Sequence, residues 1–114
     1  MPPRLTTVIL FVNMEESVGF MHGTLGLELK YQSPYWSEFV AGGITLALHP
    51  ASEKNPAGKV EIGLGVEDLQ SFYSKMSAKG VVFTQSPTKE GGSLLGRLVT
   101  PDGTEISLSE PPSR

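Results

Sequence analysis

The sequence contains no cysteine, and this absence excludes several classes of function. Without thiols the chain can form no disulfide framework, no zinc site built from thiolates and no cysteine nucleophile. The absence leaves the redox compartment open, but it is compatible with the cytoplasm. We therefore expect a cytoplasmic protein.

Positive charge is also scarce. Nine Lys and Arg residues stand against twelve Asp and Glu residues, which gives a formal net charge of −3 and a pI near 5.3. The basic residues are scattered along the chain, so no basic stripe exists to neutralise a phosphate backbone. We expect no nucleic-acid partner.

Long hydrophobic runs are missing as well. The apolar run near the N-terminus extends only from Val8 to Val12. A membrane-spanning helix needs about 20 apolar residues, and the apolar part of a signal peptide needs at least about 7. The sequence predicts neither, and we expect no membrane partner.

What is present is the composition of one folded domain. The chain has 114 residues, of which 39% are hydrophobic and 18% are charged. This balance argues against disorder and against a coiled coil, and the length suits one core. We expect a single domain over residues 1–114.

The first half of the chain predicts one strand, one helix and three further strands. The β-branched and aromatic residues of 5–12 indicate a buried strand. Asn13 is placed to cap the following helix, with Glu16 as its capping-box partner. Three more strands are expected within residues 27–32, 37–43 and 44–50.

The second half repeats this order after a polar connector at residues 51–59. A strand at 60–66 precedes a helix capped by Glu67 or Asp68 and closed by Gly80. Strands at 81–86, 93–100 and 104–110 follow. The chain therefore predicts two βαβββ modules, at about 4–50 and 59–110, and each would leave a sheet face that another unit must cover.

Two short segments carry a resemblance to a known family. They are "GFMHGTLGLELK" and "TPDGTEISLSEP". The family is the vicinal oxygen chelate superfamily, which contains glyoxalases, bleomycin resistance proteins and extradiol dioxygenases. The first segment resembles its Phe-Tyr-x-x-x-Leu-Gly-Leu segment, and the second resembles its Asp-Pro-Asp-Gly-x-x-Leu-Glu-Leu ending. The likeness extends from Leu5 to Glu110. It implies an α+β fold in which tandem βαβββ repeats form a U-shaped mixed sheet around a cleft, usually in a homodimer.

Strand alternation predicts which side chains line that cleft. In the first strand Val8, Leu10 and Val12 share one face, and Thr7, Ile9 and Phe11 share the other. In the last strand Ile106 and Leu108 lie opposite Glu105, Ser107 and Ser109. If the continuous apolar faces pack under the helices, the mixed faces form the wall of a pocket for a small, partly apolar molecule.

The resemblance also assigns four metal-ligand positions. Here they are occupied by Thr7, Ala47, Glu61 and Ser107, of which only Glu61 is a credible ligand. Divalent cations need several carboxylate or imidazole donors. We therefore expect no cofactor, and a divalent metal held by displaced donors such as His49, Glu61 and Glu105 is the disfavoured alternative.

The polar candidates each have a structural interpretation beside the functional one. Glu61 is either a solvated carboxylate or a ligand contact. The position of His49 before Pro50 is typical of a half-exposed structural histidine. His22, near the end of the first predicted helix, is most simply a favourable partner for the helix dipole. Arg97 either extends to the surface or meets an anionic ligand.

An aromatic cluster surrounds Trp36 in "YQSPYWSEF". It is compatible with the core, with a dimer contact or with stacking on a planar ligand. The predicted ligand-binding residues are therefore Thr7, Ile9, Phe11, Trp36, Ala47, His49, Glu61, Arg97 and Ser107.

Two functions remain open from the sequence. The first is a metal-free member that binds a small organic molecule in the cleft without transforming it. The second is a lyase, isomerase or dioxygenase of the same superfamily, with atypical metal ligands or with Glu61 as the catalytic general base. Three of the four metal-ligand positions hold residues that are not credible ligands, and this favours the metal-free binding function. A third interpretation is a subunit whose cleft has no ligand.

Overall fold

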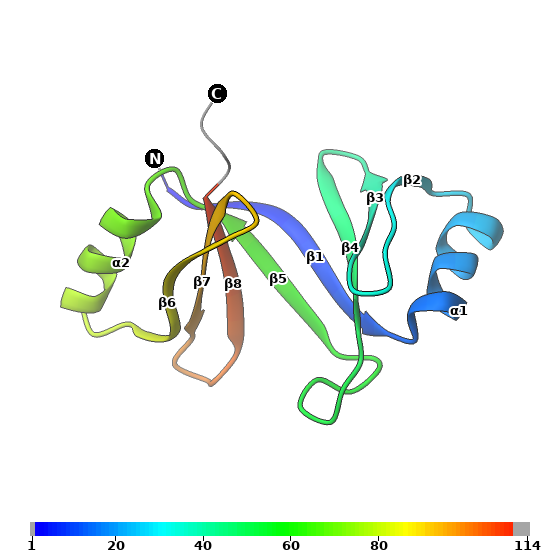
Figure 1. The fold of residues 1–114 in the computed structure, drawn as a ribbon. Helices are drawn as coiled ribbons and strands as arrows, with labels where there is room; N and C mark the ends of the chain where they lie inside the picture. Colours follow the sequence, from blue (N-terminus) through cyan, green and yellow to red (C-terminus); the bar gives the residue numbers. More distant parts are fainter. Residues whose placement is uncertain (1, 111–114) are drawn as a thin grey trace. The chain divides into compact units, whose positions relative to one another are not determined.

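A computed structural model describes residues 2–110 of the chain (Figure 1). The elements follow the predicted order, one helical segment and three strands after each leading strand. The α+β fold class built from tandem βαβββ repeats is therefore confirmed. No helix among these residues is long and apolar enough to cross a membrane.

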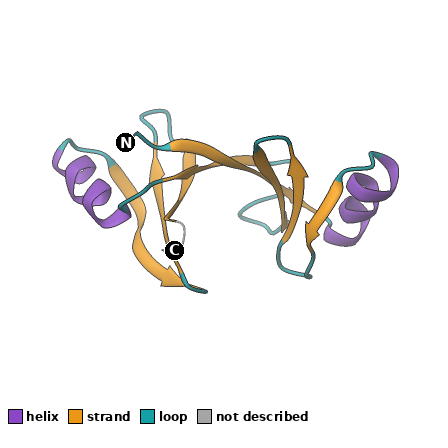
Figure 2. Cartoon of the chain, turned by 90° about the horizontal axis from the view of Figure 1, so that it is seen from above, coloured by secondary structure: helices purple, strands orange, loops and turns teal. Residues whose placement is uncertain are grey.

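The chain forms two compact units. The N-terminal unit comprises Thr6–Glu61, and the C-terminal unit comprises Ile62–Arg114 together with Met1–Leu5. In each unit one helical segment accompanies the strands (Figure 2).

In the N-terminal unit, β1 and β4 are parallel neighbours, and β3 pairs with both β4 and β2 in antiparallel fashion. Since β1 lies beside the last strand of its repeat, the helix and two strands between them form the crossover connection. The elements are β1 (Arg4–Val12), α1 (Met14–Val18), the π-helix η1 (Gly19–Thr24), β2 (Glu28–Tyr31), β3 (Ser37–Ala41) and β4 (Ile44–Pro50).

The C-terminal unit has the same arrangement. The strands β5 and β8 are parallel neighbours, and β7 pairs in antiparallel fashion with β8 and β6. The elements are β5 (Val60–Gly65), whose first two residues still belong to the N-terminal unit, α2 (Leu69–Ala78), β6 (Val82–Glu90), β7 (Ser93–Val99) and β8 (Glu105–Glu110).

Both helix starts carry the predicted cap. The side chain of Asn13 accepts a hydrogen bond from the backbone N–H of Glu16 at 3.3 Å. At α2 the cap is Asp68 rather than Glu67, and its Oδ1 accepts from the N–H of Ser71 at 3.1 Å. Each cap satisfies a backbone donor that the first turn of a helix leaves without a partner.

The end of α2 has the geometry of a Schellman motif. Gly80 takes a φ of +92°, a conformation that glycine adopts without a steric penalty. Its N–H donates to the carbonyl of Ser77, and the N–H of Val81 donates to the carbonyl of Met76. The predicted role of Gly80 in closing this helix is confirmed.

Two features differ from the sequence prediction. The first helical segment continues after α1 as a π-helix, in which the N–H of Leu25 donates to the carbonyl of Phe20. The strand β6 extends beyond Ser86 to Glu90, with a register irregularity between Gln85 and Thr88 around Pro87. As β6 pairs with β7 alone, a proline that donates no hydrogen bond is tolerated there.

Each unit packs its helix on the apolar strand face that alternation predicted. In the N-terminal unit the buried residues Val18, Phe39 and Leu48 form a core to which Leu10 and Val12 of β1 contribute. In the C-terminal unit Leu69 of α2 packs with Leu108 of β8. The opposite strand faces carry no helix of their own unit and hold the candidate site residues.

Candidate functional site

The face of the N-terminal unit that no helix covers has an aromatic and aliphatic cluster. On this helix-free face Ile9 and Phe11 of β1 lie in register with Ala47 and His49 of β4. Ile9, Phe11 and Ala47 are buried, and Trp36 packs against them. The structure thus brings together five of the predicted site residues, because strand pairing places equivalent positions side by side.

The rest of the aromatic cluster predicted around Trp36 is divided. Phe39 is fully buried in the core beneath the first helix, on the opposite face of the strands. Tyr35 is 78% exposed. Of the aromatic residues in this segment, Trp36 therefore contributes to the helix-free face and Phe39 to the core, as alternation along β3 requires.

A serine turn fixes the backbone of Trp36 before β3 begins. The Ser33 hydroxyl accepts hydrogen bonds from the N–H groups of Tyr35 at 3.2 Å and Trp36 at 3.0 Å. The same hydroxyl donates to the carbonyl of Trp36 at 2.9 Å. Such local side-chain contacts stabilise a turn in place of ladder hydrogen bonds.

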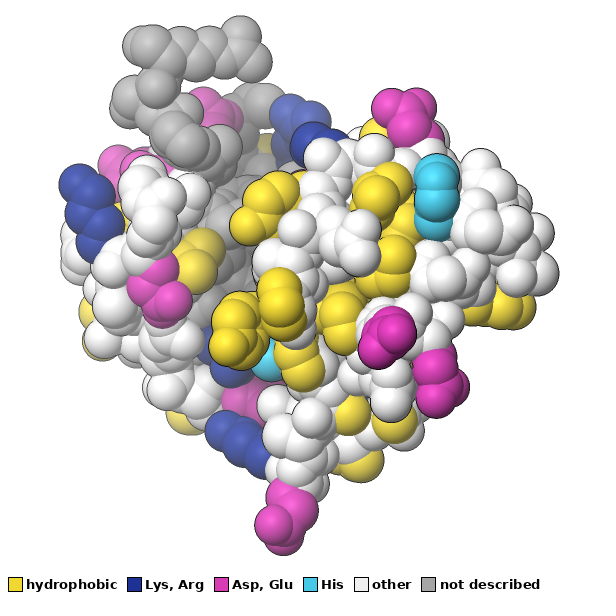
Figure 3. Space-filling view, turned by 45° about the vertical axis from the view of Figure 1, so that its right-hand side comes forward, with side chains coloured by type: hydrophobic (Ala, Val, Ile, Leu, Met, Phe, Trp, Pro, Cys, Tyr) yellow, Lys and Arg dark blue, Asp and Glu magenta, His cyan; other side chains and the backbone are white. Residues whose placement is uncertain are grey.

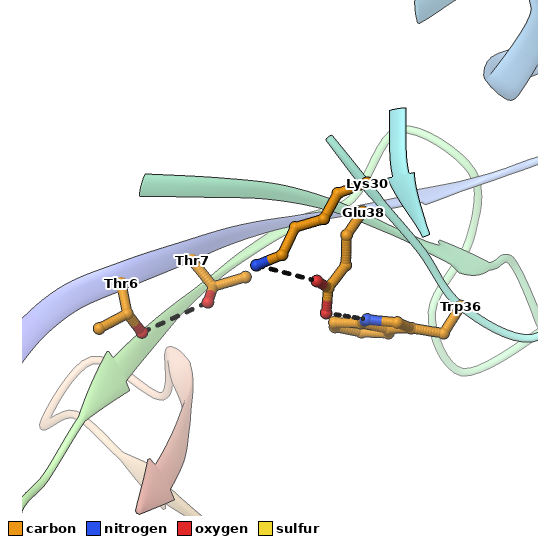
Figure 4. A network of polar contacts seen from close by, with 5 residues as sticks. All are labelled: Thr6, Thr7, Lys30, Trp36 and Glu38. Atoms are coloured by element: carbon orange, nitrogen blue, oxygen red, sulfur yellow. Dashed lines mark hydrogen bonds and ion pairs between the residues drawn. The ribbon is translucent and has the colours of Figure 1, made fainter. Parts of the chain in front are cut away.

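The indole ring of Trp36 is held by a carboxylate. Its Nε1–H donates to Oε2 of Glu38 at 2.7 Å, and Oε1 of Glu38 lies 3.7 Å from Nζ of Lys30 (Figure 4). Sequence reasoning missed Glu38 and Lys30. The available signal was the spacing of Trp36 and Glu38, since residues two apart at the start of a strand project to the same side.

His49 and Lys59 contact the cluster from its other sides. The imidazole centroid of His49 lies 5.2 Å from that of Phe11 and 6.3 Å from that of Trp36, nearly perpendicular to the indole. The ammonium of Lys59 lies 5.7 Å from the centroid of Phe11 and donates to Oδ1 of Asn55 at 2.6 Å. Phe11 therefore has a cation–π contact in addition to its packing.

Two further predicted residues, Thr7 and Glu61, belong to the N-terminal unit. The Oγ1 atoms of Thr6 and Thr7 are 3.3 Å apart (Figure 4). Glu61 is a carboxylate with only 4% of its surface exposed. Its neighbours in β5, Val60 and Ile62, are 56% and 38% exposed, so Glu61 projects to the opposite face of this strand.

The two remaining predicted residues form a polar pair in the C-terminal unit. Arg97 of β7 and Ser107 of β8 are in register, and Nη2 of Arg97 lies 3.3 Å from Oγ of Ser107. Nearby in sequence, Glu105 accepts a hydrogen bond from the hydroxyl of Thr84 at 3.3 Å. The predicted site residues therefore divide into seven in the N-terminal unit and two in the C-terminal unit.

A comparison with family models decides the family. Residues 4–108 match the model described as the Glyoxalase/Bleomycin resistance protein/Dioxygenase superfamily. The chain belongs to this superfamily. The predicted resemblance is thereby confirmed, and a comparison with curated proteins finds no match.

Solved structures with this fold include proteins of different descriptions. A hypothetical protein from Bacillus halodurans C-125 is 18% identical, with a TM-score of 0.78 over 100% of this chain and 98% of that one. A superfamily member from Vibrio splendidus 12B01 is 19% identical, with a TM-score of 0.69 over 96% of this chain and 100% of that one. Methylmalonyl-CoA epimerase of Streptomyces coelicolor, in complex with 2-nitronate-propionyl-CoA, is 17% identical, with a TM-score of 0.72 over 96% and 98%. These similarities show the fold alone.

The superfamily's metal positions do not fit a divalent cation in this chain. Ala47 presents a buried methyl group, and the hydroxyl groups of Thr7 and Ser107 each lie within hydrogen-bond distance of another side chain. Of the displaced donors, His49 and Glu61 lie in the N-terminal unit and Glu105 lies in the C-terminal unit. Within residues 2–110 no three His, Asp or Glu side chains gather into a group that could hold a metal ion.

Proposed function

We propose that this protein binds a small, planar organic molecule on the helix-free face of its N-terminal unit, without a metal ion. The observation that carries the proposal is the ordered aromatic wall of Trp36 and His49, whose rings are partly exposed and are supported by the buried Phe11. Aromatic side chains offer a large apolar contact area and prefer offset or edge contacts with a planar partner. Polar groups at its edges, such as Glu38 and His49, would orient the bound molecule, as is usual in small-molecule sites.

The fixed position of Trp36 supports binding further. The Ser33 turn holds its backbone, and the Glu38 carboxylate holds its indole N–H. A side chain that is already ordered loses less rotamer entropy when a ligand arrives, so more of the contact energy remains as affinity. The wall therefore has the preorganisation expected of a binding surface.

Titration of a panel of planar aromatic compounds, followed by the fluorescence of Trp36, tests this proposal. The chain has one tryptophan, so any change reports this site directly. Calorimetry then compares Trp36→Ala with Tyr35→Ala, since Tyr35 is adjacent but 78% exposed. Binding should be lost in the first variant and kept in the second. Failure of every compound to bind, or equal affinity in both variants, would contradict the proposal.

Metal content of the purified protein provides an independent test. We expect less than stoichiometric metal and no thermal shift with added Mn, Fe, Ni, Co or Zn, because the four superfamily positions contain one carboxylate. About one equivalent of metal per chain, with a shift that disappears in Glu61→Ala, would show a metal site with displaced ligands.

The burial of Glu61 favours a second candidate function. A carboxylate with 4% exposure is a suitable general base for a lyase or isomerase reaction, such as proton abstraction next to a carbonyl group. If the protein is such an enzyme, Glu61→Gln should abolish turnover and preserve the fold. Ligand binding without any turnover in the wild-type protein favours the binding function instead.

We also infer that the chain forms a homodimer. Within the N-terminal unit several large apolar side chains are half exposed, among them Phe20, Leu25 and Tyr31, and hydrophobic side chains reach the surface in Figure 3. If these side chains form one contiguous apolar patch, a partner subunit would be expected to cover it. Sedimentation should detect a dimer at micromolar concentration, and a monomer alone would contradict the inference.

A further inference from the structure

The ring of His49 lies at the border of the aromatic wall and solvent. His49 is exposed, whereas Phe11, its register partner on β1, is only 3% exposed. The imidazole is tilted by 52° against the Phe11 ring and by 82° against the indole of Trp36. A planar molecule placed against this wall would therefore meet an imidazole at the wall's edge.

One hydrogen bond determines which nitrogen of this ring carries the proton. Nδ1 of His49 lies 2.9 Å from the carbonyl oxygen of Pro50. A carbonyl oxygen can only accept, so Nδ1 must be the donor. In the neutral ring Nε2 is then unprotonated and has a lone pair that can accept a hydrogen bond.

The other polar groups around the wall have partners already. Glu38 accepts from the Trp36 indole and faces Lys30, and Lys59 donates to Asn55 while it covers Phe11. By contrast, Nε2 of His49 has no hydrogen-bond partner in the part of the chain that the structure describes. It is an acceptor at the edge of an aromatic surface and can receive a donor from a bound molecule.

We propose that the ligand is a planar aromatic molecule with an O–H or N–H donor at its ring edge, and that this group donates to Nε2 of His49. The proposal rests on the proposed binding function and specifies the ligand class. Stacking against the partly exposed indole of Trp36 recognises the ring, and the imidazole recognises the donor. A neutral aromatic compound without a donor would bind in the same place with lower affinity.

Two probes of nearly the same shape test the donor. We would titrate 2-naphthol, which has an O–H group, and 2-methoxynaphthalene, which has none, in the same buffer. The probes are followed by the NMR signal of the Trp36 indole N–H, which is unique in this chain. A net hydrogen bond corresponds to a preference for 2-naphthol of about threefold to tenfold.

Two histidine variants locate this preference. His49→Phe keeps an aromatic ring and removes the acceptor, so both probes should bind it with the same affinity. The matched control is His22→Phe, because Nδ1 of His22 also lies 2.9 Å from a backbone carbonyl, that of Leu27, while no aromatic ring contact joins His22 to the wall within residues 2–110. The control should retain the preference of the wild-type protein.

The possible outcomes separate this inference from the binding function on which it rests. Equal affinity of the wild-type protein for both probes would overturn the donor proposal and leave binding intact. A nitrogen-15 spectrum of the free protein with His49 protonated at Nε2 would overturn it too. If neither probe shifts the Trp36 signal, both the binding function and the donor proposal are wrong.

Discussion

The indole nitrogen of Trp36 lies 2.7 Å from a carboxylate oxygen of Glu38, two residues further along the chain. This short contact joins an apolar wall to a charged group that also faces Lys30 at 3.7 Å. The carboxylate therefore fixes the orientation of the ring on which the proposed binding surface depends.

Substitution of Glu38 should release the indole. Glu38→Gln keeps an acceptor oxygen, and Glu38→Ala removes it, so the free energy of unfolding should fall by about 1 kcal/mol in the alanine variant and by less in the glutamine variant. The indole N–H proton signal should also move upfield in Glu38→Ala. Urea titration and proton NMR measure the two effects. An unchanged indole signal in Glu38→Ala would contradict the hydrogen bond.

The start of α2 should depend on a residue 41 positions away. Oε1 of Glu110 accepts from the backbone N–H of Leu69 at 2.7 Å, in addition to the Asp68 cap. Glu110→Ala should destabilise the protein by about 1 kcal/mol, as loss of a helix cap does. Thermal unfolding of Glu67→Ala provides the control, because Glu67 is exposed and caps nothing among the described residues. Equal melting temperatures for the two variants would exclude the cap.

The core of the C-terminal unit should be sensitive at Leu69. This side chain is fully buried and packs with Leu108 and Val66. Leu69→Ala should lower the free energy of unfolding by about 2–5 kcal/mol, because the transfer energy is lost and a cavity remains. Chemical denaturation compares it with Val60→Ala, where the side chain is 56% exposed and the expected loss is about 0.5 kcal/mol or less.

A side chain at position 80 should lower the stability of the protein. The φ of Gly80, +92°, strains any other residue, although the surroundings are open. Gly80→Ala should therefore cost about 1–2 kcal/mol of stability. Gly43→Ala is a suitable control, since Gly43 has no positive φ and a Cβ there would meet no atom within 4 Å. Similar melting temperatures for the two variants would mean that α2 does not end in the conformation described.

The features that sequence predicted well are those with a local or periodic cause. Alternation along the first strand separated Leu10 and Val12 from Ile9 and Phe11, and the two sets do lie in different clusters. The cap at Asn13 follows from side-chain chemistry within one turn. Such signals need no knowledge of the partner strand.

The features that sequence missed depend on pairing or on hydrogen-bond register. An α-helix and a π-helix differ in which carbonyl each N–H reaches, and the apolar spacing of residues 19–24 does not distinguish them. The continuation of β6 beyond Pro87 depends on β7, which pairs with it.

The parallel pairing inside each unit has a consequence for synthesis on the ribosome. In both units the first strand lies beside the last, β1 with β4 and β5 with β8. An emerging chain therefore cannot complete the strand pairing of the N-terminal unit until Pro50 has left the exit tunnel, and the pairing of β5 with β8 must wait for Glu110. The strands of the two units pair in succession, and between these events β5 has left the ribosome while its parallel neighbour is still unmade.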